Sequence, residues 1–173
     1  MAVAKTKKLV LNALLLALII ISMYSQALLQ TVKITLIVIP SLLMGVSLKK
    51  TGFRSAIILW ISASILSFIV APYKISAVLF FIFFGLYPII KDFVESHLSK
   101  KISFIIKFIF FNISMLLIYL IYILLITPAF NFPINIFLII GGLYVAFIIY
   151  DYFFSFFIQW LLSQTFFKNS NLE

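Results

Sequence analysis

Residues 102–126 read ISFIIKFIFFNISMLLIYLIYILLI, an apolar run that carries a single charge at Lys107. A helix needs about 20 predominantly apolar residues to cross the hydrocarbon core of a bilayer. The run therefore predicts a membrane-spanning helix that ends before Pro128. Other apolar runs along the chain extend this expectation to six spans, at approximately residues 9–29, 34–48, 55–71, 75–94, 102–126 and 133–162.

Two of these spans contain helix-interrupting residues. The second is short and includes Pro40, which removes a backbone hydrogen bond and predicts a kink or a tilt. The fourth is interrupted near Gly85 and Pro88.

The composition supports the same class of protein. Of the 173 residues, 65% are hydrophobic and 10% are charged, whereas a soluble domain is roughly 45–50% apolar and about 25% charged. So few charges cannot cover a water-facing surface. We therefore expect an all-α integral membrane bundle, with residues 1–173 forming a single transmembrane domain.

The positive charges predict the orientation of these spans. With the N-terminus inside, only Lys33 and Lys74 fall in outer loops. The other Lys and Arg residues lie on the inner side: Lys5, Lys7, Lys8, Lys49, Lys50, Arg54, Lys91, Lys100, Lys101, Lys107 and Lys168. By the positive-inside rule, both termini should be cytoplasmic. Because the positive charges behind the net charge of +9 cluster at helix ends, where they set orientation, we expect a multi-pass cell-membrane protein that contacts the lipid bilayer and no nucleic acid.

The first span has two distinct faces. Ala13 and Ala17 are four residues apart and share one face, where they could let a neighbouring helix approach or could contact a partner protein. Ser22, Gln26 and Gln30 recur with the same spacing on another face. Gln26 and Gln30 could bond to the outer loops or could line an outward-facing pocket.

The fifth and sixth spans each carry a stripe of polar and aromatic side chains. The stripes consist of Asn112, Met115, Tyr119 and Tyr122 in one span and of Tyr144, Phe147, Asp151 and Ser155 in the other. Small-molecule sites often combine aromatic walls with few polar groups. The stripes predict either such a cavity or interhelical packing through a few hydrogen bonds.

Asp151 is the one acid placed deep in a predicted span, where an ionised carboxylate must be paired or else protonated. At 1.5 Å of rise per residue, Lys91 and Lys107 lie in the same inner layer. We therefore predict an ion pair between Asp151 and one of these lysines. It could lock three helices together or could form a substrate or proton site. Asp92 and Glu95 should make only weak, exposed pairs with nearby lysines.

The motifs of several enzyme classes are missing from the sequence. There is no Cys, no Walker A loop, no HExxH motif and no Ser/His/Asp set. No acidic pair inside the spans has metal-ligand spacing. We therefore expect no enzyme activity, no cofactor and no metal site.

Two stretches resemble known membrane proteins. The start KKLVLNALLLAL, residues 7–18, together with the size and the six spans, resembles an S component of an energy-coupling factor transporter, whose first helix carries an AxxxA-type motif matched here by Ala13 and Ala17. The stretch FFGLYPIIKDFVE at Phe83–Glu95, followed by Lys107, Asn112 and the pair Tyr150–Asp151, is similar to an uncharacterised group of Firmicute membrane proteins of this type.

The resemblance implies a bacterial subunit that captures a small water-soluble nutrient, such as a vitamin or its precursor. Its partners would be a transmembrane coupling protein, contacted by Ala13 and Ala17, and two cytoplasmic ATPases. The pocket would be bordered by Gln26, Gln30, Asn112, Tyr119, Tyr122 and Tyr144. The alternatives are a non-transporting membrane scaffold of envelope assembly and a small integral membrane enzyme.

Overall fold

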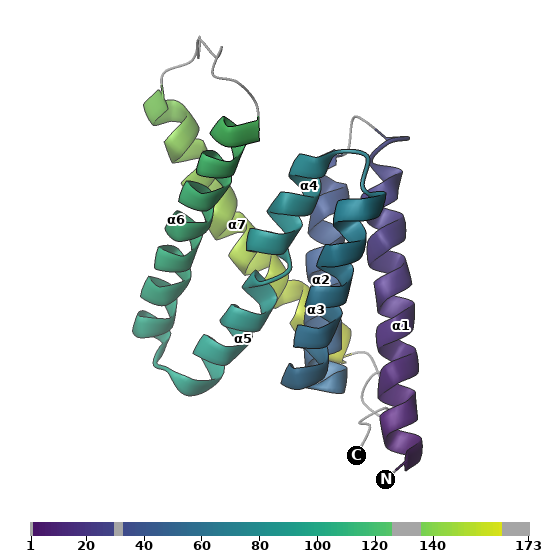
Figure 1. The fold of residues 1–173 in the computed structure, drawn as a ribbon. Helices are drawn as coiled ribbons and strands as arrows, with labels where there is room; N and C mark the ends of the chain where they lie inside the picture. Colours follow the sequence, from purple (N-terminus) through teal and green to yellow (C-terminus); the bar gives the residue numbers. More distant parts are fainter. Residues whose placement is uncertain (1, 30–32, 126–135, 164–173) are drawn as a thin grey trace.

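The computed structural model describes residues 2–29, 33–125 and 136–163, and within these residues all regular structure is helical. The elements are α1 (Ala2–Ser25), α2 (Lys33–Thr51), α3 (Phe53–Val70), α4 (Lys74–Leu79), the π-helical segment η2 (Phe80–Phe84), α5 (Tyr87–His97), α6 (Lys100–Leu125) and α7 (Ile136–Ser163). Because α4, η2 and α5 follow one another as a single interrupted helix, the described residues form six helices (Figure 1).

Five of these six helices are long and apolar enough to cross a membrane: α1, α3, the composite helix Lys74–His97, α6 and α7. The predicted all-α class is thereby confirmed for the described residues, together with several candidate spans. The helix that does not qualify is α2, which has 19 residues with lysines at both ends. It packs against α1, α3, η2, α5 and α7, so it is the central helix of the bundle.

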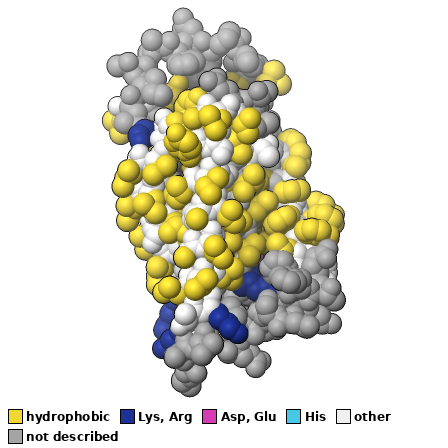
Figure 2. Space-filling model, turned by 90° about the vertical axis from the view of Figure 1, so that its right-hand side faces the viewer, with side chains coloured by type: hydrophobic (Ala, Val, Ile, Leu, Met, Phe, Trp, Pro, Cys, Tyr) yellow, Lys and Arg dark blue, Asp and Glu magenta, His cyan; other side chains and the backbone are white. Residues whose placement is uncertain are grey.

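The helices alternate in direction, as Figure 1 shows. One end of the bundle holds the starts of α1, α3 and α6 and the ends of α2 and α5. Most of the lysines and Arg54 are therefore gathered at this end, here called the basic end. Figure 2 views the α1 side and shows hydrophobic side chains over the middle of that face, with basic side chains mostly near its lower end.

The first helix differs from the prediction at both ends. It begins at Ala2 and ends at Ser25, where backbone turns follow through Ala27 N–Tyr24 O and Leu28 N–Ser25 O bonds of 3.0 Å each. The predicted continuation to Leu29 is wrong, because the candidate span Lys5–Ser25 already covers the hydrocarbon thickness. Gln26 therefore lies in a turn beyond the helix.

The interruption predicted near Gly85 and Pro88 is confirmed as the π-helical segment η2. The Gly85 N–H donates to the Phe80 carbonyl at 2.7 Å, five residues back. Pro88 has no N–H to continue the regular helical pattern. A Cβ added at Gly85 would lie 2.6 Å from Trp60 Cδ1 and 2.8 Å from the Phe80 carbonyl oxygen, so only glycine fits against α3 here.

The interior is divided between apolar and aromatic clusters. Residues such as Ile19, Met44 and Ala63 pack where α1, α2 and α3 meet. An aromatic cluster of Phe83, Tyr87, Phe111 and Phe147 fills the space between the composite helix, α6 and α7. The backbones of these helices diverge in Figure 1. The aromatic cluster holds the helices together.

Candidate functional site

A cluster of four charged side chains joins α5, α6 and α7. Asp151 of α7 forms an ion pair with Lys91 of α5, and its Oδ2 lies 2.8 Å from Lys107 Nζ of α6. Glu95 completes the cluster, because its Oε1 lies 2.9 Å from Lys91 Nζ and 2.8 Å from Lys107 Nζ. The two lysines that the sequence offered as alternative partners of Asp151 are therefore both paired with it.

The two lysines are the most buried members of this cluster. The side chains of Lys91 and Lys107 are only 5% and 8% exposed, whereas Asp151 is 19% and Glu95 is 43% exposed. At 1.5 Å per residue, the lysines lie roughly 10 Å from the ends of α5 and α6. A buried ammonium is costly unless it is paired and hydrogen-bonded. The cluster meets this requirement with two positive and two negative charges.

Neighbouring hydroxyl groups add hydrogen bonds to the charged cluster. The Tyr87 hydroxyl, from a fully buried side chain, donates to Asp151 Oδ1. The adjacent Tyr150 is hydrogen-bonded to Ser41 of α2, so α7 is also tied to the central helix. Tyr87 was not predicted as part of this site, and Glu95 was predicted to make only weak, exposed pairs. The spacing of four residues from Tyr87 to Lys91 and from Lys91 to Glu95 is the signal that places all three on one helix face.

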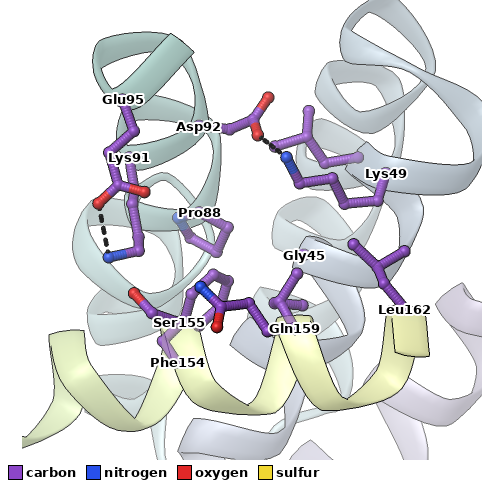
Figure 3. A pocket seen from close by; sticks show the side chains of 12 residues that line it. Gly45, Lys49, Pro88, Lys91, Asp92, Glu95, Phe154, Ser155, Gln159 and Leu162 are labelled. Carbon is purple, nitrogen blue, oxygen red and sulfur yellow. Dashed lines mark hydrogen bonds and ion pairs between the residues drawn. The ribbon is translucent and has the colours of Figure 1, made fainter. Parts of the chain in front are cut away.

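A cleft of about 170 Å³ opens beside this cluster, between α2, α5 and α7 (Figure 3). Lys91 and Glu95 line one side, and the ion pair between Asp92 and Lys49 lines the other. Figure 3 shows Ser155 and Gln159 of α7 directed toward this space. Its floor is apolar and includes Pro88, Phe154 and Ile158.

The close crossing of α2 and α7 at this cleft depends on Gly45. A Cβ added at Gly45 would lie 2.6 Å from Phe154 Cζ and 2.8 Å from Ile158 Cδ1. Glycine thus lets two helices approach, as small residues commonly do in membranes. This role of Gly45 was not predicted from the sequence.

The acids of this region are bound to amines. Asp92, Glu95 and Asp151, the acids within the described residues, all form ion pairs with lysines. Each of these acids has at least one carboxylate oxygen paired with a lysine ammonium, which suits a structural lock better than a free general base. The geometry can hold helices together by charge, and it presents a polar cleft at the basic end.

The residues predicted to border a substrate pocket lie in separate places. In α6 and α7, Tyr144 Oη donates to Asn112 Oδ1 at 2.7 Å, while Asn112 Nδ2 donates to the Phe108 carbonyl. Gln26 is buried beside α1, where its Nε2 lies 3.4 Å from Met23 Sδ. Because α1 and α6 lie on opposite sides of the bundle (Figure 1), Gln26 is not brought together with the Asn112–Tyr144 pair.

The remaining predicted site residues have varied surroundings. Tyr119 is exposed and Tyr122 is half-buried on α6, while Gln30 lies outside the described residues. Ala13 and Ala17 are exposed on α1. Their small size is therefore not explained by packing against another described helix of this chain.

Comparisons of the chain with protein-family models, with curated proteins and with solved structures found no match.

Proposed function

We propose that this chain is the substrate-capturing membrane subunit of an ATP-driven importer of the energy-coupling factor type. It would serve a small water-soluble nutrient, such as a vitamin or a vitamin precursor, in a bacterial cell membrane. In this proposal the chain crosses the bilayer six times, because α2 also spans the membrane in addition to the five candidate spans. The basic end and both termini lie in the cytoplasm, on the side of the two partner ATPases.

The observation that carries the proposal is the exposed small-residue strip on α1. Ala13 and Ala17 face outward, whereas Leu15 and Ile19 of the same helix are buried against the bundle. Small residues let two helix backbones come close within a membrane. A strip that no described helix of this chain covers is therefore suited to a second membrane protein, and the coupling protein is the partner that we propose.

The charged cluster has a defined part in this proposal. A substrate-capturing subunit must move relative to its partner without coming apart, and the Lys91–Asp151–Lys107 contacts hold α5, α6 and α7 as one unit. The proposed pocket uses the polar groups of Asn112 and Tyr144, which lie one to two helical turns farther from the basic end than Lys107 and Asp151.

The test is purification of the protein from its native host, with mass spectrometry of co-purifying proteins and of bound small molecules. The proposal predicts a coupling protein, two ATPases and a nutrient-sized molecule. Recovery without any ATPase or coupling protein would count against it.

The double variant with Ala13→Trp and Ala17→Trp should lose the partners in the same purification. It should keep its fold, which thermal unfolding in detergent will show.

A matched control is available on another exposed helix face. Gly142 and Ala146 are exposed and four residues apart near the start of α7, on the far side of the bundle from α1 (Figure 1), and replacing both with Trp adds similar bulk away from the strip. This control should retain the partners. Equal loss of partners in both paired variants would refute the assigned contact surface.

A second candidate, a non-transporting membrane scaffold, is favoured by one specific observation. The polar groups of Asn112, Tyr144 and Gln26 already have partners within the bundle, as expected for interhelical packing. A scaffold would co-purify with envelope-assembly proteins and would carry no nutrient. The same mass spectrometry experiment therefore separates the two candidates.

A further inference from the structure

A second cavity, of about 390 Å³, lies at the basic end between the α5–α6 turn and α7. It shares Glu95, Ser155 and Gln159 with the cleft described above, but α6 provides its opposite wall. None of the roles assigned above uses this cavity. Its polar lining and its position at a helix start indicate the kind of ligand that it would accept.

The α6 wall presents Lys100, Ser103 and Lys107 to the cavity. These residues are three and four positions apart and therefore share one helix face. Lys107 is committed to Glu95 and Asp151, whereas Lys100 forms no ion pair with any described residue. Ser103 is buried, and its Oγ has no hydrogen-bond partner among the described residues. The wall thus has an unpaired positive charge and spare hydrogen-bonding capacity.

The start of α6 adds a further positive potential. The first turn begins with Lys100 and Lys101 and contains no acid. The N-terminal end of a helix carries a partial positive charge and free N–H groups, which favour an anion and disfavour lysines. A bound anion would relieve this unfavourable arrangement. The nearby Glu95 carboxylate is already neutralised by its contacts with Lys91 and Lys107.

We propose that this cavity binds a phosphate group, held by Lys100 and by the N–H groups at the start of α6. Basic pockets between helices near a membrane surface are known to suit anionic headgroups. The side chains of Phe104, Ile105 and Ile109 are exposed farther along α6, so acyl chains could lie beside them. The phosphate could therefore belong to an anionic lipid or to a soluble phosphate ester. The proposal does not depend on the importer function.

Lys100 and Lys101 provide a matched pair of variants for the test. Both side chains are exposed at the same end of α6, but only Lys100 lines the cavity. Lys100→Gln and Lys101→Gln each remove one positive charge. Because both residues are exposed, both variants should fold, which thermal unfolding in detergent without added lipid will show.

Binding is measured on the full chain in detergent by native mass spectrometry, with phosphatidylglycerol, phosphatidylcholine or glycerol 3-phosphate added. We expect phosphatidylglycerol to bind more tightly than phosphatidylcholine. Lys100→Gln should weaken its binding about tenfold, as for one lost charge-assisted hydrogen bond, and Lys101→Gln should change it much less.

The arms of the experiment distinguish the sources of the phosphate. Binding of phosphatidylglycerol without competition by glycerol 3-phosphate supports a lipid headgroup, and binding of glycerol 3-phosphate supports a soluble ester. The absence of binding by both phosphate probes would overturn the proposal. Equal weakening in Lys100→Gln and Lys101→Gln would also overturn it, because a general charge effect would then be sufficient.

Discussion

Replacing Asp151 with Asn tests the energetic role of the charged cluster. The substitution keeps the size of the side chain but removes one of two negative charges that balance Lys91 and Lys107. Both ammonium groups would then share Glu95, which is 43% exposed. Removing one partner of a buried pair typically costs 3–5 kcal/mol. Since solvent reaches Glu95, we expect the lower end, about 3 kcal/mol, or about 100-fold in the unfolding equilibrium.

The assay is unfolding of the detergent-solubilised protein by sodium dodecyl sulfate, followed by tryptophan fluorescence. The matched control is Asp92→Asn, which makes the same chemical change in the exposed pair with Lys49, whose side chains are 30% and 42% exposed. Exposed pairs contribute about 0.2–1 kcal/mol. If Asp151→Asn destabilised the protein no more than Asp92→Asn, the idea of a buried lock would be refuted.

A double variant separates charge imbalance from the loss of contacts. Lys91→Met combined with Asp151→Leu removes one charge of each sign and leaves the Lys107–Glu95 pair in place. Apolar replacement of a whole buried pair is often neutral. The double variant should therefore be more stable than Asp151→Asn. A double variant that is less stable than Asp151→Asn would show that contacts and not charge balance dominate.

Two further predictions concern close packing and the tyrosine hydroxyl. Gly45→Ala should cost about 1–3 kcal/mol through overpacking against Phe154, whereas Gly141→Ala, where a Cβ meets nothing within 4 Å, should be neutral or slightly stabilising; equal effects in the same unfolding assay would contradict the assigned α2–α7 crossing. Tyr87→Phe should cost about 1.5–3 kcal/mol, because it removes a hydrogen bond to a charged carboxylate. Unchanged stability of Tyr87→Phe would show that this bond contributes nothing.

The parts of the fold that follow from apolar runs were predictable from the sequence. Span positions need only length and composition, and the interruption near Gly85 and Pro88 follows from the backbone chemistry of those residues. The pairing of Asp151 was also predictable, because depth along a helix is simple arithmetic at a fixed rise per residue. An unpaired charge in hydrocarbon is costly enough to leave few alternatives.

The buried face of each helix was harder to predict, because lipid and protein interior are equally apolar. On α6, Ile105, Ile109 and Ile113 are exposed while Phe111 is buried, and hydrophobicity does not separate them. Polar residues are a better guide: Ser103, Lys107 and Ser114 of the same helix are all buried. They recur at helical spacing on the side that faces the bundle.

The candidate pocket was only partly predictable for a related reason. Asn112 and Tyr144 were placed correctly on facing stripes and are hydrogen-bonded to each other. However, Gln26 was assumed to continue α1, which ends at Ser25. The sequence SQALLQ contains no Pro or Gly to mark that end, and the packing of α1 against α2 and α3 is a tertiary effect. The role of Gly45 was missed because it depends on α7, which is distant in sequence.

The central claim is that the chain spans a membrane with its basic end in the cytoplasm, and cysteine labelling tests it most directly. Because the protein has no native cysteine, single substitutions at Lys74 and Lys100 report opposite ends of the bundle (Figure 1). A membrane-impermeant maleimide is applied to intact cells and to lysed cells. We predict that Lys74→Cys is labelled in intact cells and that Lys100→Cys is labelled only after lysis. Labelling of Lys100→Cys in intact cells, with Lys74→Cys protected, would contradict the account.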